Sequence, residues 1–216
     1  MARLDRSLRL ALATSASLEG LPGSILSAAN GDVVRSLLVT SGRDGEGKST
    51  MAVGMAAALA RQSNAAVLLV DGNARRPALA DWFDVPAEPG FHEWLVDAAL
   101  DAVIHRTETP GLSVLTAGGR AASIPDLLTA FPLRLKTLLE RFAYVVMDGD
   151  SILTSAGAAM FAKHVDGIVL VAECERTKWE VIAETRSRLD RMGGRVLGVA
   201  LNKRKFYIPG VFYGKR

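Results

Sequence analysis

The sequence predicts an α/β protein in which a doubly wound, mostly parallel β-sheet carries helices on both faces. Two observations support this fold class. Short apolar runs, several of which end in an acidic residue, alternate along the chain with alanine-rich or amphipathic segments of helical period. The first apolar run is also followed directly by a glycine-rich loop and a helix-forming segment, the order in which open α/β folds bind phosphate.

The first strand is expected at residues 36–40 (SLLVT), a short apolar run suited to a buried position. A helix is expected at residues 51–60 (MAVGMAAALA), ending near Arg61, because alanine has the highest helix propensity. Between the two, residues 42–49 match the pattern Gly-x4-Gly-Lys-Ser of a phosphate-binding P-loop. The fold class is therefore refined to a P-loop NTPase fold.

The loop is expected to bind a nucleotide. Its glycines let successive backbone N–H groups point into one anion-sized cradle, Lys48 reaches the β- and γ-phosphates, and the Ser49 hydroxyl is placed for Mg²⁺. The predicted nucleotide-binding residues of the loop are Gly42, Arg43, Asp44, Gly45, Glu46, Gly47, Lys48, Ser49 and Thr50.

Acidic residues follow the next strands. Residues 65–70 (AAVLLV) end in Asp71, residues 144–147 (YVVM) end in Asp148, and residues 167–171 (GIVLV) end near Glu173. Because ligands of open α/β folds bind at the carboxyl ends of the strands, Asp71 and Asp148 should lie near Lys48. A last strand is expected at residues 196–201 (VLGVAL).

The segments between the strands are expected to be helical. Helices are predicted at residues 90–99, at residues 124–142 with a break near Pro132, and at residues 176–192 before a Gly-Gly stop. Residues 116–122 (TAGGRAA) are expected to form a surface loop near the site.

The acids complete a predicted magnesium and phosphotransfer site. A triphosphate needs Mg²⁺, which prefers oxygen ligands, so Ser49, Asp71 and Asp148 are the expected metal-side residues. Asp148 has the place of a Walker B acid, and Asp71 is also a candidate base for an incoming hydroxyl. The predicted catalytic residues are thus Lys48, Asp71 and Asp148, with a plain turn-forming aspartate as the alternative for each acid.

Composition is that of a soluble globular core: 216 residues, 49% hydrophobic and 23% charged. This is the size of one α/β domain, here residues 1–216, with an N-terminal helical segment at residues 1–34 and a basic tail at residues 203–216. The formal net charge is +3, and the excess lies at the two ends. Solvated charge is the common reason for such ends, so no nucleic-acid partner is expected.

Other site classes receive little support. Cys174 is the only cysteine, and the three histidines are scattered without the spacing of metal ligands. The N-terminus resembles a secretion signal only superficially, because Asp5 and Arg9 interrupt its apolar part, and no apolar run reaches the length of a membrane span. With ATP chemistry, these features predict a cytoplasmic protein.

Three motifs carry a resemblance to a known family. VTSGRDGEGKST, VLLVDGNARRPAL and FAYVVMDGD resemble, in order and spacing, the Walker A, Walker A′ and Walker B motifs of bacterial tyrosine kinases of the CpsD/CapB type. Further matches, among them PGFHEWL, IPDLLTA and GGRVLGVALNKR, extend the resemblance over nearly the whole chain. It implies a fold like that of the ParA and MinD ATPases, ATP with Mg²⁺ as cofactors, and a nucleotide-side position for Asn202 after the last strand.

The resemblance also implies a function. Such kinases phosphorylate tyrosines, commonly in their own tails and in neighbouring subunits, and act in capsule or exopolysaccharide production. The implied partners are a membrane polysaccharide co-polymerase or adaptor and further copies of the chain. The protein would then be cytoplasmic and peripheral to the inner membrane through its partner.

The chain departs from the family pattern at several positions. Asn73 replaces the second acid of Walker A′, and Asp150 follows the Walker B acid where it is expected to form a turn or, less often, to restore a carboxylate. Arg3 replaces the leading acid of an assembly motif that otherwise keeps Arg6 and Arg9. Only Tyr207 and Tyr213 follow the last strand as candidate phosphoacceptors.

These departures leave three functions open. The first is an autophosphorylating tyrosine kinase, and the second is a catalytically weak module whose ATP state controls docking on a membrane co-polymerase. The third and least favoured is a MinD- or ParA-like ATPase, because such proteins have a lysine at the position of Arg43, and arginine keeps its charge but not its reach.

Overall fold

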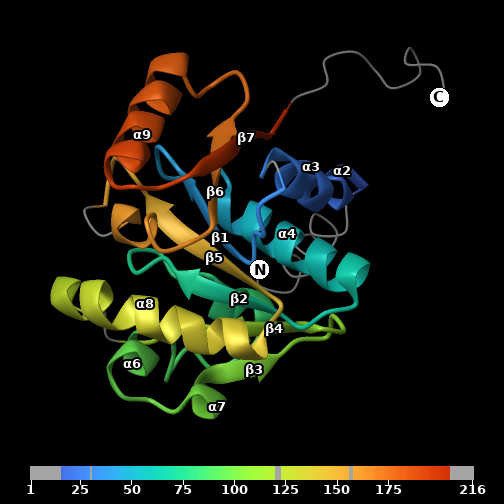
Figure 1. Ribbon diagram of the computed structural model, residues 1–216, viewed down its shortest axis with the longest axis vertical. Helices are drawn as coiled ribbons and strands as arrows, with labels where there is room; N and C mark the ends of the chain where they lie inside the picture. The colour runs from blue at the N-terminus through green and yellow to red at the C-terminus, as the bar shows by residue number, and fades with distance from the viewer. Residues whose placement is uncertain (1–15, 30, 120–122, 156–157, 205–216) are drawn as a thin grey trace.

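The computed structural model describes residues 16–29, 31–119, 123–155 and 158–204, which surround a seven-stranded sheet (Figure 1). The strand order is β3-β4-β2-β5-β1-β6-β7, and every neighbouring pair is parallel except β3 with β4. The strands are β1 Ser36–Ser41, β2 Val67–Gly72, β3 Ile104–Arg106, β4 Leu112–Leu115, β5 Tyr144–Ser151, β6 Gly167–Glu173 and β7 Val196–Asn202.

The five long parallel strands confirm the predicted fold class. All residues of β1 and β2 are buried, as continuous apolar runs covered on both faces require. The short strands β3 and β4 were not predicted, because IHR is too short to show a period and LSVL is interrupted by Ser113.

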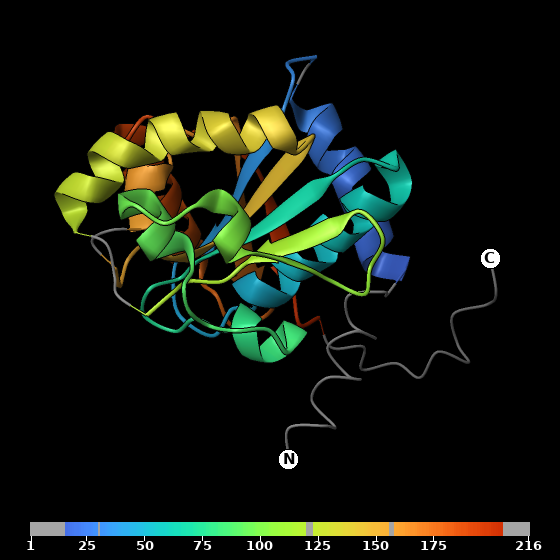
Figure 2. The ribbon, with the colours of Figure 1, turned by 90° about the horizontal axis from the view of Figure 1, so that it is seen from below.

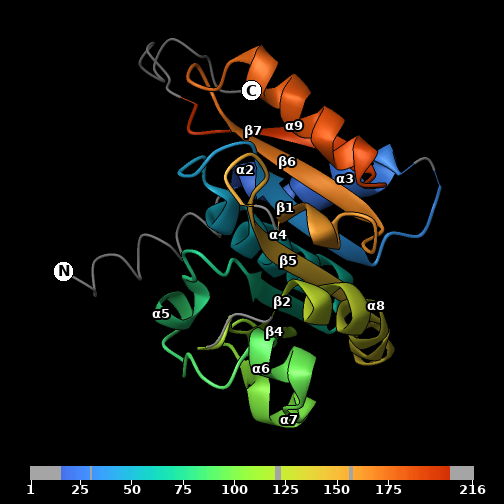
Figure 3. The same cartoon turned by 90° about the vertical axis from the view of Figure 1, so that its left-hand side faces the viewer.

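Helices cover both faces of the sheet, and Figure 2 shows α8 over one face with α4 over the other. Their bounds are α2 Ala16–Glu19, α3 Leu21–Ala28, α4 Lys48–Ser63, α5 Leu79–Phe83, α6 Phe91–Val96, α7 Leu100–Val103, α8 Ile124–Arg141, the 3₁₀ helix η1 Ala158–Phe161, and α9 Trp179–Arg191. One apolar cluster joins α3, α4 and α5 to the sheet, and a second joins α6, α7, α8, η1 and α9. Figure 3 shows α9 along β6 and β7 at one end of the sheet, with α6 and α7 near β4 at the other.

The predicted break near Pro132 is wrong, because α8 continues through this residue. Proline in a helix interior removes one N–H donor and costs about 3 kcal/mol. Burial of Phe131, Leu135 and Leu138 on the sheet-facing side of α8 offsets this cost, since each is at most 4% exposed.

Two other predictions need correction. The helix expected at residues 90–99 ends at Val96, and a separate short helix, α7, follows it. The surface loop expected at residues 116–122 begins in the interior, because Thr116 and Ala117 are buried and their carbonyl groups accept the N–H bonds of Phe91 and His92. Residues 120–122 lie outside the described part of the chain.

Several predictions fall on the chain ends. Arg3, Arg6 and Arg9 lie outside the described residues, as do Tyr207 and Tyr213. Within the described part of the chain, none of the helices combines the length and apolar character that crossing a bilayer requires.

Candidate active site

The P-loop connects β1, an interior strand between β5 and β6, to the first residue of α4. Gly47 precedes the helix with φ of 95°, a left-handed conformation that favours glycine. A Cβ atom at Gly47 would lie 1.9 Å from the side-chain nitrogen of Asn202, so the loop passes close to the end of β7. The helix N-terminus faces the loop, which is the arrangement that binds phosphate.

Hydrogen bonds within the loop and from the ends of β6 and β7 brace the P-loop. The Glu46 carboxylate accepts hydrogen bonds from the Arg43 backbone N–H, at 2.9 Å, and from the Thr177 hydroxyl. The Asn202 amide donates to the Glu46 carbonyl at 3.0 Å, and the Lys203 ammonium donates to the Gly45 carbonyl at 2.5 Å. The shape of the loop is therefore fixed in part by segments far away in the sequence.

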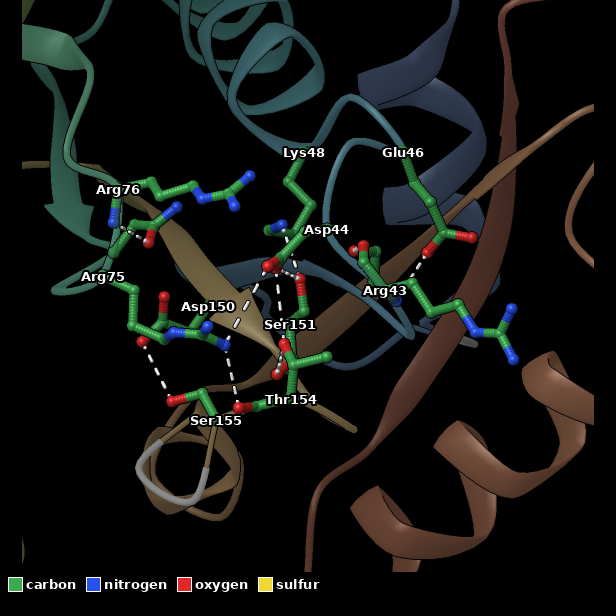
Figure 4. Close-up of polar contacts among 12 residues, drawn as sticks. Arg43, Asp44, Glu46, Lys48, Arg75, Arg76, Asp150, Ser151, Thr154 and Ser155 are labelled. Carbon is green, nitrogen blue, oxygen red and sulfur yellow. Dashed lines mark hydrogen bonds and ion pairs between the residues drawn. The ribbon is translucent and has the colours of Figure 1, made fainter.

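The P-loop lysine contacts the Walker B segment through a serine (Figure 4). Lys48 Nζ donates to Ser151 Oγ at 2.8 Å, and Ser151 Oγ donates to Asp44 Oδ1 at 2.6 Å. Lys48 is 6% exposed and Ser151 is 1% exposed. The hydrogen bond from Ser151, together with the positive charges of Lys48, Arg75 and Arg76, holds the pKa of Asp44 below its usual value despite an opposing effect of burial.

Arg75, from the segment after β2, also reaches this group (Figure 4). One of its nitrogens donates to the Thr154 carbonyl at 2.8 Å and lies 3.9 Å from Asp44 Oδ2. The Thr154 hydroxyl lies 3.3 Å from Asp44 Oδ1. Residues from the Walker A, A′ and B segments therefore surround the Asp44 carboxylate.

Asp148 is a buried carboxylate whose oxygens accept no hydrogen bond from the described residues. Burial and the charge of Asp71 raise its pKa to about 7, against the opposing effects of Ser49 and Lys48. The Ser49 hydroxyl is near enough to lower this pKa, but it does not meet hydrogen-bond geometry to either Asp148 oxygen. Such an unpaired buried carboxylate is costly, so it fits a site completed by a cation.

Asp71 pairs with Asp148 in the register of β2 and β5, and it is fully buried. Its oxygens accept three backbone N–H bonds, from Asn73 at 3.1 Å, Ala78 at 2.9 Å and Leu79 at 3.0 Å. Burial raises the pKa of Asp71, and these three bonds oppose the rise. Three of the roughly four acceptor positions of a carboxylate are therefore in use.

The residues that depart from the family pattern also have defined places. Asn73 is buried, and its side-chain oxygen accepts the Arg76 backbone N–H at 3.0 Å. Asp150 lies in β5 and is 7% exposed, so the expected turn is wrong; its carboxylate accepts a bond from the Ser155 hydroxyl at 3.0 Å. Burial raises the pKa of Asp150, against the opposing effects of Ser155 and Arg75.

The structure brings most of the predicted site residues together. Lys48, Ser49, Asp71 and Asp148 meet at the carboxyl ends of β1, β2 and β5, while Asn202 contacts the loop from β7. Arg43 is exposed and lines a cavity of about 120 Å³ with Arg176, and Thr50 lies in the first turn of α4. Ser151, the last residue of β5, and Thr154, just beyond it, were not predicted, because isolated hydroxyl residues carry no spacing signal.

A donor set of this kind fits Mg²⁺ and a nucleotide. The cradle requires glycine at position 47, the lysine side chain is held inside the site, and an unpaired carboxylate stands beside the Ser49 hydroxyl. These are the parts that P-loop proteins use for phosphate and metal.

Sequence comparison finds relatives of known class. The chain is 30% identical over 171 residues to the tyrosine-protein kinase CpsD of Streptococcus agalactiae, covering 77% of this chain and 74% of that protein. It is 29% identical over 192 residues to the putative tyrosine-protein kinase CapB of Staphylococcus aureus, with 88% and 84% covered. It is 32% identical over 180 residues to the succinoglycan biosynthesis transport protein ExoP of Rhizobium meliloti, covering 80% of this chain but 23% of ExoP. No protein-family model matches the chain.

Solved structures agree with the sequence relatives. The kinase domain of VpsO superposes with a TM-score of 0.78 at 30% identity, with 94% of this chain and 99% of that domain covered. The septum site-determining protein MinD of Pyrococcus horikoshii, solved with Mg-ADP, has a TM-score of 0.64 at 23% identity, with 78% and 70% covered, a likeness of fold alone. The chain belongs to the bacterial tyrosine kinases of the CpsD/CapB type, a family of capsule and exopolysaccharide biosynthesis.

Proposed function

We propose that this chain binds ATP with Mg²⁺ and transfers the γ-phosphoryl group to tyrosine, in its own tail and in neighbouring copies. The observation that carries this proposal is the unpaired, buried carboxylate of Asp148 beside Ser49 and Lys48 at the mouth of the P-loop. Bound Mg²⁺ would neutralise charge on the β- and γ-phosphates.

The residues of the site have separate proposed roles in phosphoryl transfer. Lys48 and the loop N–H groups stabilise charge on the transferring phosphoryl group, while Ser49 and Asp148 hold the metal. Asp71 is held by three backbone N–H bonds, so its retained acceptor position suits a metal-bound water better than the proton of a tyrosine. Its proposed role is therefore to accept a hydrogen bond from a metal-bound water rather than to act as the base.

The described tyrosine is a poor acceptor for this site. Tyr144 is half-buried at the first residue of β5, and Asp148 lies four residues further along the same strand. At about 3.3 Å per residue, the two are about 13 Å apart. The proposed acceptors are Tyr207 and Tyr213, which lie outside the described residues.

The proposed partner is a membrane polysaccharide co-polymerase, to which the chain would be held at the cytoplasmic side of the membrane. ExoP supports this proposal, because a longer protein named for succinoglycan transport contains a region similar to this chain. The test is co-purification of the full chain with the co-polymerase of its own gene neighbourhood, in the presence of Mg-ATP or Mg-ADP.

The central experiment compares wild type with Lys48→Met. The full chain is incubated with labelled Mg-ATP, and phosphotyrosine is measured together with ATP binding. We expect labelled tyrosine in wild type and a loss of about 10²–10³ in the rate with Lys48→Met, because one electrostatic contact to the transition state is removed. Wild type that binds ATP and yet never labels tyrosine, alone or with its partner, would falsify the kinase proposal.

A second function is favoured by Asn73. Its side-chain oxygen accepts the Arg76 backbone N–H, which occupies one of its two acceptor positions, and the neutral amide offers no charge to a metal. We therefore keep, as an alternative, a module whose ATP state controls docking on the membrane partner with little transfer. ATP-dependent docking of a wild-type chain without phosphotyrosine distinguishes this function from the first.

A further inference from the structure

Ser151 has no role in the tyrosine phosphorylation proposed above. Its hydroxyl accepts a hydrogen bond from Lys48 at 2.8 Å and donates one to Asp44 at 2.6 Å. Because Lys48 is the residue that holds the γ-phosphate in the proposed function, Ser151 Oγ lies one contact away from the phosphoryl group. We propose that Ser151 is an internal phosphoacceptor, with Asp44 as the group that receives its proton; the inference rests on the proposed kinase function.

The arrangement is that of an activated nucleophile. In enzymes that use a hydroxyl nucleophile, a base lies within hydrogen-bond reach of the hydroxyl, and a third group orients the base. Here the base is Asp44, and its orienting groups are the Thr154 hydroxyl at 3.3 Å and Arg75 at 3.9 Å. Figure 4 shows these side chains converging from the P-loop, the segment after β2 and the end of β5.

Asp44 is suited to accept the proton mainly by its position. The Ser151 hydrogen bond and the neighbouring cations hold its pKa low, so the carboxylate is charged at neutral pH. Phosphoryl transfer passes through a loose transition state in which the placement of the nucleophile matters more than the strength of the base. A weak base that is already bonded to the hydroxyl is therefore sufficient.

The proposed step balances with ATP as the only co-reactant. A bond forms between Ser151 Oγ and the γ-phosphorus, and the bond from that phosphorus to the bridging oxygen of ADP breaks. The serine proton moves to Asp44 and from there to solvent, which the 31% exposed Asp44 side chain can reach. The products are phosphoserine and ADP.

Burial predicts that the transfer occurs within one molecule. Ser151 is 1% exposed, and the buried Lys48 lies against it, so the active site of another copy cannot reach it in the folded chain. Ser155 provides a matched comparison in the same segment, because its hydroxyl bonds to Asp150 rather than to Lys48 or Asp44.

The experiment maps phosphorylated residues on the full chain by mass spectrometry after incubation with Mg-ATP. We expect phosphoserine at Ser151 in wild type and in Ser155→Ala, and none at that position in Ser151→Ala. Asp44→Asn, which keeps an acceptor oxygen but loses the charge, should slow the reaction about 10²-fold. The rate per molecule should stay constant when the protein is diluted tenfold.

Several outcomes would overturn the inference. Phosphotyrosine without phosphoserine at Ser151 rejects it and leaves the kinase proposal intact, whereas no label of any kind despite bound ATP rejects both. Label on Ser151 of a Lys48→Met chain mixed with wild type rejects transfer within one molecule, and an unchanged rate in Asp44→Asn rejects the role of Asp44. If Ser151→Ala fails to bind Mg-ADP, the presence or absence of phosphoserine at Ser151 in wild type and in Ser155→Ala still tests the inference.

Discussion

At the scale of single residues, the site concentrates acidic groups in the interior. Asp71, Asp148 and Asp150 are all buried, and the pKa of each is raised with burial as the largest cause. Asp71 and Asp150 accept hydrogen bonds, whereas Asp148 accepts none from the described residues. The group without hydrogen bonds should therefore be the most sensitive to pH and to metal.

The first prediction concerns the pH dependence of stability in the absence of metal and nucleotide. The pKa of Asp148 is near 3.8 in the unfolded chain and about 7 in the folded chain. Between these two values the folded state holds a proton that the unfolded state has lost, so the free energy of unfolding falls as pH rises and levels off above about 7. Relative to Asp148→Asn, the free energy of unfolding of wild type should fall by about 4 kcal/mol across this pH window.

Denaturant unfolding of both proteins at pH values from below to above this window measures the difference. Mg²⁺ with ADP, added above the folded-state pKa, should restore stability to wild type more than to Asp148→Asn, because the metal binds the charged carboxylate. Parallel pH profiles of the two metal-free proteins would contradict the prediction.

The sequence identified Lys48, Ser49, Asp71 and Asp148 because each belongs to a spaced motif. It did not identify Ser151, whose role depends on the pairing of β1 with β5, where Ser41 and Ser151 are register partners. Asp150 was expected in a turn because Asp and Gly favour turns, but pairing with β1, where Ser41 is the register partner of Ser151, extends β5 through it. Long-range pairing of this kind has no local signal.

At the scale of elements, the P-loop contains two glycines with positive φ but different surroundings. Gly47 has φ of 95° and faces Asn202, whereas Gly45 has φ of 84° and open space where a Cβ atom would lie. The same substitution at both positions therefore separates backbone strain from steric exclusion.

We expect Gly45→Ala to destabilise the protein by about 1–2 kcal/mol through left-handed strain alone. Gly47→Ala should cost more and should weaken Mg-ADP binding by at least about tenfold, or about 1.4 kcal/mol, because Asn202 must move away from the loop. Calorimetric titration with Mg-ADP measures both variants, and equal affinities would show that the Asn202 contact does not shape the cradle.

Helix α8 gives a second prediction at this scale. Pro132 interrupts its hydrogen bonding while Phe131, Leu135 and Leu138 keep it on the sheet. Pro132→Ala should raise the free energy of unfolding by about 1–3 kcal/mol, because the missing N–H donor returns and the ring no longer crowds the preceding turn. Denaturant unfolding tests this, and a destabilised variant would show that α8 depends on the proline ring for packing.

The sequence predicted elements well where the apolar pattern was long. The five parallel strands stand out as continuous apolar runs, while β3 and β4 are too short to do so. The break at Pro132 was a reasonable local inference that tertiary packing overrides. Local sequence patterns thus identified the five parallel strands, whereas the continuation of α8 through Pro132 depends on tertiary burial.

At the scale of the whole molecule, the site is built from segments spread over most of the chain. The P-loop, the ends of β2 and β5, and the ends of β6 and β7 all contribute contacts around it. Ligand binding should therefore be linked to global unfolding rather than to one local segment.

We expect Mg-ADP at about a hundred times its Kd to stabilise the chain by about 2.7 kcal/mol, which raises Tm by about 5–10 °C in one cooperative transition. Thermal unfolding followed by circular dichroism and by intrinsic fluorescence should give the same midpoint. Two separate transitions would argue against this linkage, and an equal shift in Lys48→Met at the same Mg-ADP concentration would show that Lys48 does not contribute to Mg-ADP affinity.

The place of β1 in the sheet also determines how rigid the site is before a nucleotide binds. β1 lies between β5 and β6 and is buried along its whole length, so its amide protons should exchange with solvent only when the entire sheet opens. The P-loop follows this slowly exchanging strand in the chain, and hydrogen bonds from Asn202 and Lys203 hold it in place. The P-loop should therefore already have its binding conformation before a nucleotide arrives. The association rate of the nucleotide should be limited by diffusion rather than by folding of the loop.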